Sequence, residues 1–136
     1  MIARQETRRP PRVARRRALA AAAGALVVAA GLATHLLAPE GPLSDAAGDA
    51  LYAALVYLLG VSLVPRARGW RVAIGAYAWC AFVELLQLTA LPASWAASFP
   101  PLVVVFGSVF APQDLLLYAA GVVAACAIDS AARRSA

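Results

Sequence analysis

The chain has 136 residues, of which 62% are hydrophobic and 14% are charged, and its mean hydropathy is +0.73. Soluble domains carry about 25% charged residues, so this composition excludes an ordinary water-soluble domain. The length supports one compact unit. The net charge of +5 comes from twelve arginines and no lysine. These arginines cluster at the ends of apolar blocks, which favours the lipid bilayer as partner and argues against nucleic acid.

The first apolar block covers residues 18–38, between Arg15-Arg16-Arg17 and the helix-breaking run 39–42. Its length fits the roughly 20 residues that cross a bilayer as a helix. We expect residues 1–17 to form a basic cytoplasmic tail that contacts anionic lipids. Three arginines before an alanine-rich segment also resemble a twin-arginine or secretory signal. A retained span is favoured, because removal of the segment would split the arginines between the two sides of the membrane.

Two further spans follow in the same manner. The second covers residues 46–64, with Ser44 as a plausible N-cap. The third covers residues 72–91 and ends at Pro92. Cys80 and Cys126 lie in different apolar blocks at different depths, so we expect no disulfide between them.

The last part of the chain holds one short apolar run and one full span. Residues 101–111 are too short to cross and have no basic flank, so we expect them to lie at the interface or to be re-entrant. A fourth span covers residues 112–128, opened by Pro112, and residues 130–136 form a second cytoplasmic tail. The predicted fold is therefore an all-α integral membrane bundle of four transmembrane helices over residues 18–129. A fifth crossing by residues 101–111 is the alternative.

The arginines also predict the orientation of this bundle. With four spans, every arginine falls on one side, and neither loop on the other side contains a basic residue. The positive-inside rule then places both termini in the cytoplasm.

Charged side chains inside spans are costly and need a partner or a purpose. Glu84 lies about 10 Å inside the outer end of the third span, at about 1.5 Å per residue. Tyr77, Cys80, Glu84 and Gln87 form a stripe at spacings of 3, 4 and 3. This stripe should face the bundle, with Glu84 hydrogen-bonded by His35 or Gln87.

The other spans also place polar groups in the outer half. Asp49 is followed a turn later by Tyr52, Asp114 is followed by Tyr118, and His35 lies near the end of the first span. We expect these groups to meet in an outer-half polar cluster that binds a polar head group or another small ligand. The predicted ligand-binding residues are His35, Asp49, Tyr52, Glu84, Gln87, Asp114 and Tyr118. The inner half offers no such set, and its Asp129 should pair with Arg133 at the i, i+4 spacing.

Several alternatives remain open. Asp114 can simply complement the dipole of its own helix, and Asp49 can be solvated at the interface. The cluster can also be purely structural, with close helix approach at glycines 24, 31, 60, 75 and 121. A membrane enzyme acting on a lipid-linked envelope substrate could use Glu84 and Asp114, and a buried carboxylate could also carry protons. No metalloprotease, paired-cysteine or nucleophile-elbow motif occurs, so we expect no catalytic residue, no metal and no cofactor.

Three strings occur in order between Gly48 and Gly121. They are Gly48-Asp49-Ala50-Leu51-Tyr52, Val83-Glu84-Leu85-Leu86-Gln87, and Gly107-Ser108-Val109-Phe110 leading through Asp114-Leu115 and Tyr118 to Gly121. Together they resemble the small bacterial membrane proteins of domain of unknown function family 2809, which are similar to the VanZ-like group.

The resemblance implies a multi-pass helical protein of the bacterial inner (plasma) membrane without a defined biochemical role. VanZ-like proteins are linked to glycopeptide tolerance and the cell envelope, which implies an envelope role by analogy. The residues that match the family strings are Asp49, Tyr52, Glu84, Gln87, Asp114 and Tyr118. One departure is that the family often has arginines between the glutamine string and the Gly-Ser-x-Phe string, whereas residues 92–109 here contain none.

Overall fold

The structure is a computed structural model that describes residues 11–107 and 109–135, and every regular element in those ranges is a helix. The long helices are α1 (Arg12–Leu37), α2 (Pro42–Leu63), α3 (Gly69–Leu86) and α6 (Asp114–Arg134). The short helices α4 (Leu91–Ser98), η1 (Pro100–Leu102) and α5 (Val103–Phe106) lie between α3 and α6. The predicted all-α class is confirmed.

Length and hydropathy decide which helices can cross a membrane. Among the described residues, α1, α2 and α6 are long and apolar enough to do so alone. Helix α3 qualifies only together with α4, which turns away from it by 87° after a short break. The described part of the chain therefore has three helices that can span a bilayer, or four if the bent pair is one span.

Helices α1, α2 and α3 begin earlier than the apolar blocks predicted, whereas α6 begins at Asp114, two residues after the predicted Pro112, and continues into the predicted tail 130–136. Helix α1 begins at Arg12, inside the predicted tail 1–17, of which residues 1–10 lie outside the described ranges. Helix α2 begins at Pro42, because proline at the first position loses no helical hydrogen bond. Ser44 does not act as the N-cap residue; its hydroxyl accepts a hydrogen bond from the Gly41 N–H at 3.1 Å.

The third helix ends five residues before the predicted Leu91. Helix α3 stops at Leu86, and Pro92 lies in the first turn of α4. A proline inside a continuous helix would remove one hydrogen bond and clash with the carbonyl four residues before it. The chain avoids this clash by breaking before Pro92 and starting a new helix in another direction. The apolar run 101–111 contributes η1 and α5, which complete a helical hairpin with α4.

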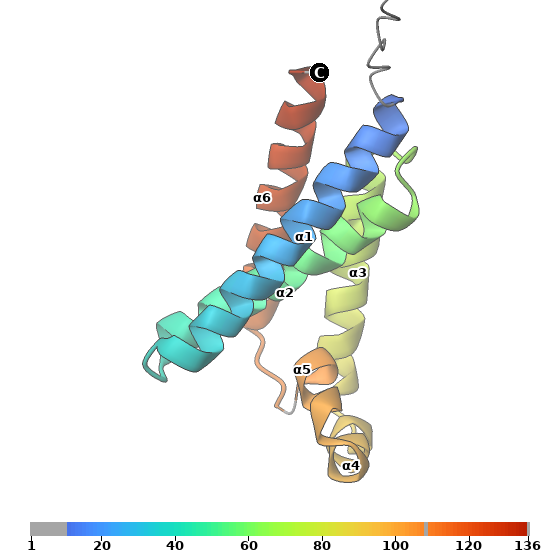
Figure 1. Cartoon of the computed structure of the whole chain (residues 1–136). Coiled ribbons are helices and arrows are strands. Elements are labelled where there is room, and N and C mark those ends of the chain that lie inside the picture. The colour runs from blue at the N-terminus through green and yellow to red at the C-terminus, as the bar shows by residue number, and fades with distance from the viewer. Residues whose placement is uncertain (1–10, 108, 136) are drawn as a thin grey trace, which may run out of the picture.

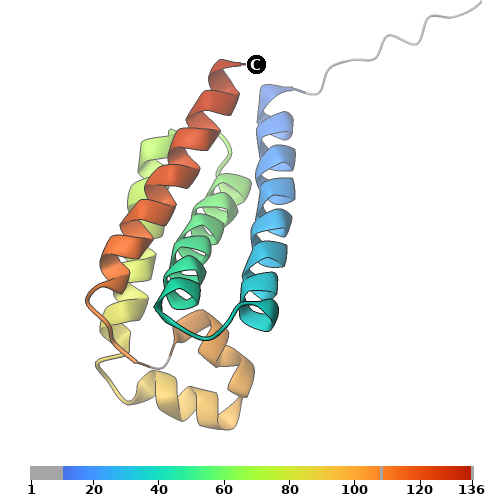
Figure 2. The same cartoon turned by 90° about the vertical axis from the view of Figure 1, so that its left-hand side faces the viewer.

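Helix α2 lies at the centre of the bundle and packs against α1, α3 and α6 (Figures 1 and 2). The start of α1, the α2–α3 loop and the end of α6 lie together at one end, which we call the arginine end. The described arginines lie in these segments or in the first turn of α3: Arg12, Arg15, Arg16, Arg17, Arg66, Arg68, Arg71, Arg133 and Arg134. The α4–η1–α5 hairpin and the α1–α2 loop lie at the opposite end, the hairpin end.

The core is small and its outer surface is apolar. Ala53, Tyr57 and Val61 of α2 pack against buried residues of α3 and α6, while Leu37 and Leu43 are more than 80% exposed. Large exposed hydrophobic side chains occur on every long helix. Such a surface suits contact with acyl chains rather than water.

Two of the five helix-facing glycines predicted from sequence lie at close contacts. A Cβ on Gly121 would collide with the backbone carbonyl oxygen of Ala50, and one on Gly60 would lie 2.8 Å from Val72 Cγ1. Gly31 and Gly75 have no such neighbour, and Gly24 is in ordinary contact. The α2–α6 crossing therefore depends on Gly121.

We predict that Gly121→Ala forces α2 and α6 apart and lowers the free energy of unfolding by about 1–3 kcal/mol, as overpacking generally does. Equilibrium unfolding in mixed SDS–detergent micelles measures this loss. Gly75→Ala is the matched control, since an added Cβ there meets open space and alanine is the better helix former. Equal stability of the two variants would contradict the predicted close crossing.

Candidate functional site

The strongest polar interaction lies at the arginine end and joins the first helix to the last. Arg16 Nε donates to Asp129 Oδ1 at 3.1 Å, and Arg16 Nη2 donates to Asp129 Oδ2 at 2.7 Å. The Arg16 and Asp129 side chains are 9% and 11% exposed. This paired geometry is the one that binds a carboxylate most strongly.

Further groups complete this cluster. Arg16 Nη1 donates to the carbonyl oxygens of Pro65 at 2.6 Å and Ala67 at 2.7 Å, which ties the α2–α3 loop to α1. Tyr57 of α2 donates its hydroxyl to Asp129 Oδ2 at 2.8 Å. One arginine and one carboxylate thus connect α1, α2, α6 and the loop before α3.

This cluster corrects two expectations. The inner half was predicted to lack a polar set, and Arg16 was assigned to a cytoplasmic tail; instead Arg16 is buried in α1. The expected Asp129–Arg133 pair exists, but at 3.6 Å and with Arg133 39% exposed it is the weaker contact. Arg16, which is 113 residues from Asp129 in sequence, forms the shorter and bidentate contact with it.

Glu84 is the fully buried acidic residue of α3. Its Oε1 accepts a hydrogen bond from the Ala111 backbone N–H at 2.6 Å, and its Oε2 accepts one from the Tyr118 hydroxyl at 3.2 Å. Neither His35 nor Gln87, the partners expected from sequence, forms these bonds. Glu84 therefore fastens the segment that leads into α6 to the middle of the bundle.

Gln87, one turn after Glu84, also binds the chain where it leads from α5 to α6. Its Nε2 donates to the Phe106 carbonyl oxygen at 2.8 Å, at the end of α5. The next residue, Gly107, has φ of 62°, and a Cβ there would collide with Gln87 Nε2. Ser108 of the same string lies outside the described residues.

An acidic pair lies beside Glu84 at the hairpin end. The carboxyl groups of Asp49 and Asp114, from α2 and α6, lie near each other and near that of Glu84, so their negative charges interact. Both residues are half-buried, and Asp45 is exposed one turn before Asp49. Two carboxylates this close repel each other unless a proton or a cation lies between them.

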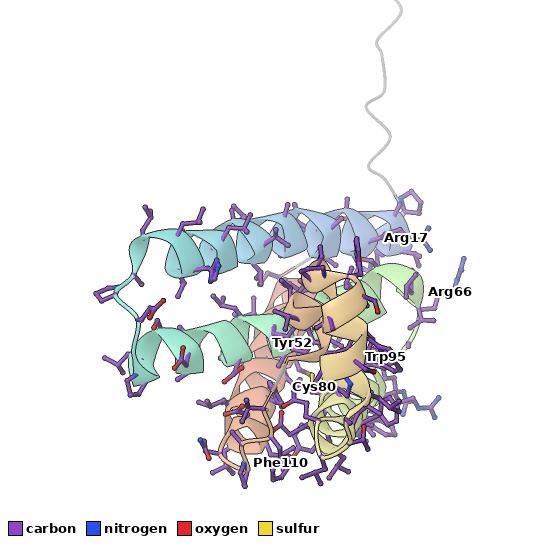
Figure 3. The ribbon with its side chains drawn as sticks, turned by 90° about the horizontal axis from the view of Figure 1, so that it is seen from below. Arg17, Tyr52, Arg66, Cys80, Trp95 and Phe110 are labelled. Atoms are coloured by element: carbon purple, nitrogen blue, oxygen red, sulfur yellow. The ribbon has the colours of Figure 1, made fainter. Side chains whose placement is uncertain are left out.

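Aromatic side chains surround this acidic region. The Tyr52 and Tyr118 ring centroids are 6.2 Å apart, and Trp79 Nε1 donates to the Tyr52 hydroxyl at 3.1 Å. Viewed from the hairpin end, Tyr52 and Cys80 lie toward the middle of the molecule, near α2 and α3 (Figure 3). The predicted residues Asp49, Tyr52, Glu84, Asp114 and Tyr118 thus lie in one region.

His35, expected in the cluster, and Tyr77, expected on the bundle-facing stripe of the third span, both lie elsewhere. His35 is exposed near the end of α1, and its side chain forms no hydrogen bond or ion pair with the described residues. Tyr77 is 37% exposed, because the buried face of α3 runs through Ala76, Cys80, Val83 and Glu84. Among the residues that the structure describes, no three acidic, histidine or cysteine side chains form a metal site.

We predict that Glu84→Leu lowers the free energy of unfolding by about 2–4 kcal/mol, because the Ala111 N–H and the Tyr118 hydroxyl lose their acceptor. Glu84→Gln should cost about 1 kcal/mol, since the amide oxygen can still accept from Ala111. Unfolding in mixed micelles compares the two variants. Equal losses would contradict the assigned hydrogen bonds.

At the other end, Asp129→Asn should lower the free energy of unfolding by about 3 kcal/mol, because it leaves the buried Arg16 guanidinium without a counter-charge. Arg133→Gln is the matched comparison and should cost less than about 1 kcal/mol, as exposed pairs do. The same unfolding measurement applies. A larger effect of Arg133→Gln would show that the local pair, rather than Arg16, holds Asp129.

Comparison with known proteins agrees with the sequence strings. Residues 39–122 match the family described as "Protein of unknown function (DUF2809)". The matched region contains the acidic region and Tyr57, while α1 and the Asp129 end of α6 lie outside it. No curated protein and no solved structure matches the chain. Since the match covers more than half of the 136 residues, the chain belongs to the DUF2809 family.

Proposed function

We propose that this chain is a four-span protein of the bacterial inner membrane, with both termini in the cytoplasm. The bent α3–α4 pair then counts as the fourth span, in which α3 crosses the membrane and α4 turns along the outer surface as part of the α4–η1–α5 hairpin. The separation of charge supports this topology. All described arginines lie at one end, whereas Glu40, Asp45, Asp49, Glu84 and Asp114 lie at or toward the other. Basic residues near spans remain on the cytoplasmic side, and there they contact anionic lipids.

The proposed role is to bind an ammonium head group in the outer leaflet through Asp49 and Asp114. The observation that carries it is the approach of these two carboxyl groups within reach of a third acid, Glu84. Among the described residues, the hairpin end has no arginine, and its histidine is exposed. A cationic group between the aspartates would remove their repulsion and supply hydrogen-bond donors.

Glu84 itself has a different part in this proposal. Both of its oxygens are used by Ala111 and Tyr118 inside the protein, which supports the structural alternative for this residue. The two aspartates remain half-buried and lie in the halves of α2 and α6 that are nearer the hairpin end. Ligand binding is therefore assigned to Asp49 and Asp114, with Glu84 keeping α6 and its preceding segment in place beside them.

A role in the cell envelope is part of the same proposal. It is supported by the resemblance of the family strings to VanZ-like proteins and by the outward position of the acidic pair in the proposed topology. Envelope lipids with a free amine are the ligand class that fits the two carboxylates.

We predict that phosphatidylethanolamine stabilises the purified full chain against thermal unfolding more than phosphatidylcholine with the same acyl chains. Both head groups are cationic at nitrogen, but only the primary ammonium donates hydrogen bonds. Asp49→Asn and Asp114→Asn should each remove most of this difference. Glu40→Gln, an exposed acid of the α1–α2 loop, should leave it intact.

The result against this function is an unchanged difference between the two lipids in the Asp49→Asn/Asp114→Asn double variant. A loss of basal stability without a change in lipid preference would assign the pair to the structural alternative. Loss of the preference in Glu40→Gln as well would indicate a diffuse effect of acidic charge rather than this pair.

A further inference from the structure

A groove of about 1020 Å³ lies between α1 and α6 and reaches the arginine end. Its floor is formed by α2, which separates α1 from α6 (Figure 2). Its lining is aliphatic and includes Leu19, Ala23 and Val27 of α1, Leu51 and Ala54 of α2, and Ala124 of α6. The volume is at the upper end of the range of about 300–1,000 Å³ that small-molecule pockets occupy.

The groove exists because α1 packs along α2 and has no comparable contact with α6 within the described residues. The Arg16–Asp129 pair bridges α1 and α6 near the mouth of the groove. The side chains of Ala54 on the floor and Ala124 on the α6 wall are small and leave open space below that bridge. A long, thin apolar molecule is the shape that fits this space.

The mouth of the groove is strongly basic. Arg12, Arg15, Arg66, Arg68 and Arg133 line it, together with the paired Arg16 and Asp129. Within residues 11–107 and 109–135, both ion pairs use Asp129, so Arg12, Arg15, Arg66 and Arg68 form none there. Arg66 lies at the edge of the molecule in the view from the hairpin end (Figure 3). Arginine is the side chain best suited to bind phosphate oxygens.

The depth of the groove matches one leaflet. From Leu19 to Val27, the apolar wall of α1 rises by about 12 Å at about 1.5 Å per residue. One leaflet accounts for about half of a hydrocarbon core that is about 30 Å thick. An acyl chain inserted here from the arginine end would therefore remain within its own leaflet.

We propose that this groove binds one anionic phospholipid of the leaflet at the arginine end. An acyl chain lies between α1 and α6, and the phosphate is held at the mouth by Arg15, Arg66 and Arg68. A helix from a second copy would also fit a groove lined by alanine. It would bring a second set of arginines to the same mouth, and like charges disfavour that arrangement. The proposal is independent of the Asp49–Asp114 site, which lies toward the other end.

The test uses the full chain purified in a neutral detergent and titrated with phosphatidylglycerol or phosphatidylcholine of identical acyl chains. Native mass spectrometry counts bound lipids, and the shift in thermal unfolding gives the affinity. We expect one saturable phosphatidylglycerol site, at least about tenfold tighter than for phosphatidylcholine, given the gain from several arginines. Glycerol phosphate and inorganic phosphate should cause no comparable shift.

Two pairs of variants test the two parts of the site. Arg66→Gln/Arg68→Gln should weaken phosphatidylglycerol binding roughly tenfold, while Arg71→Gln/Arg134→Gln removes the same charge outside the groove and should change it less than about twofold. Ala124→Leu should block the acyl chain. Ala127→Leu, an exposed alanine of α6 outside the groove, should not.

Several results would overturn the proposal. Equal losses in both arginine variants would show diffuse surface attraction, and equal binding of inorganic phosphate would show a site for the ion alone. Normal binding in Ala124→Leu would place the acyl chain elsewhere. A dimer that dissociates in Ala124→Leu would assign the groove to a second copy. The phosphatidylethanolamine response through Asp49 and Asp114 should persist in both groove variants and in both of their controls.

Discussion

The bidentate contact between Arg16 and Asp129 organises this fold. Helix α1 packs along α2 and has no extensive contact with α6 among the described residues, so this ion pair is the main polar bond between the first helix and the last. It also uses the carbonyl oxygens of Pro65 and Ala67, which would otherwise lack partners at the end of α2. Inside a protein, such a network is stabilising only when nearly every donor and acceptor is used. Tyr57 supplies one of the remaining donors to Asp129.

Each end of the bundle buries one charged side chain, and the two buried charges have opposite signs. At the arginine end, a buried cation is satisfied by a carboxylate and two carbonyl groups. At the hairpin end, the buried carboxylate of Glu84 is satisfied by a backbone N–H and a tyrosine hydroxyl. Each network ties a connecting segment to the helices: Arg16 holds the α2–α3 loop, and Glu84 holds the residues before α6. The charged groups that are not used in these networks are arginines at one end and aspartates at the other. The two ligand sites are proposed from these groups.

Much of this arrangement could be predicted from sequence, because apolar length and arginine position are local properties. The helical class, the burial of Glu84 and the grouping of Asp49, Asp114 and Tyr118 follow from helical spacing. The Arg16–Asp129 pair could not be found in this way, since its members are 113 residues apart. Counting arginines for topology also treats each one as solvated. Glu84 accepts a hydrogen bond from the backbone N–H of Ala111, which no side-chain pattern reveals. The position of Pro92 predicted a helix end at Leu91, but α3 already ends five residues earlier, at Leu86.

The crossing of α2 and α6 relates the two proposed sites to each other. Ala50 lines the groove and touches Gly121 through its backbone, and the residue beside it is Asp49. From this crossing, α2 and α6 continue toward the arginine end as the floor and one wall of the groove. In the other direction they lead to Asp49 and Asp114. The separation of these two helices therefore controls both the depth of the groove and the distance between the carboxyl groups. A glycine at position 121 is needed because any side chain there would widen both sites at once.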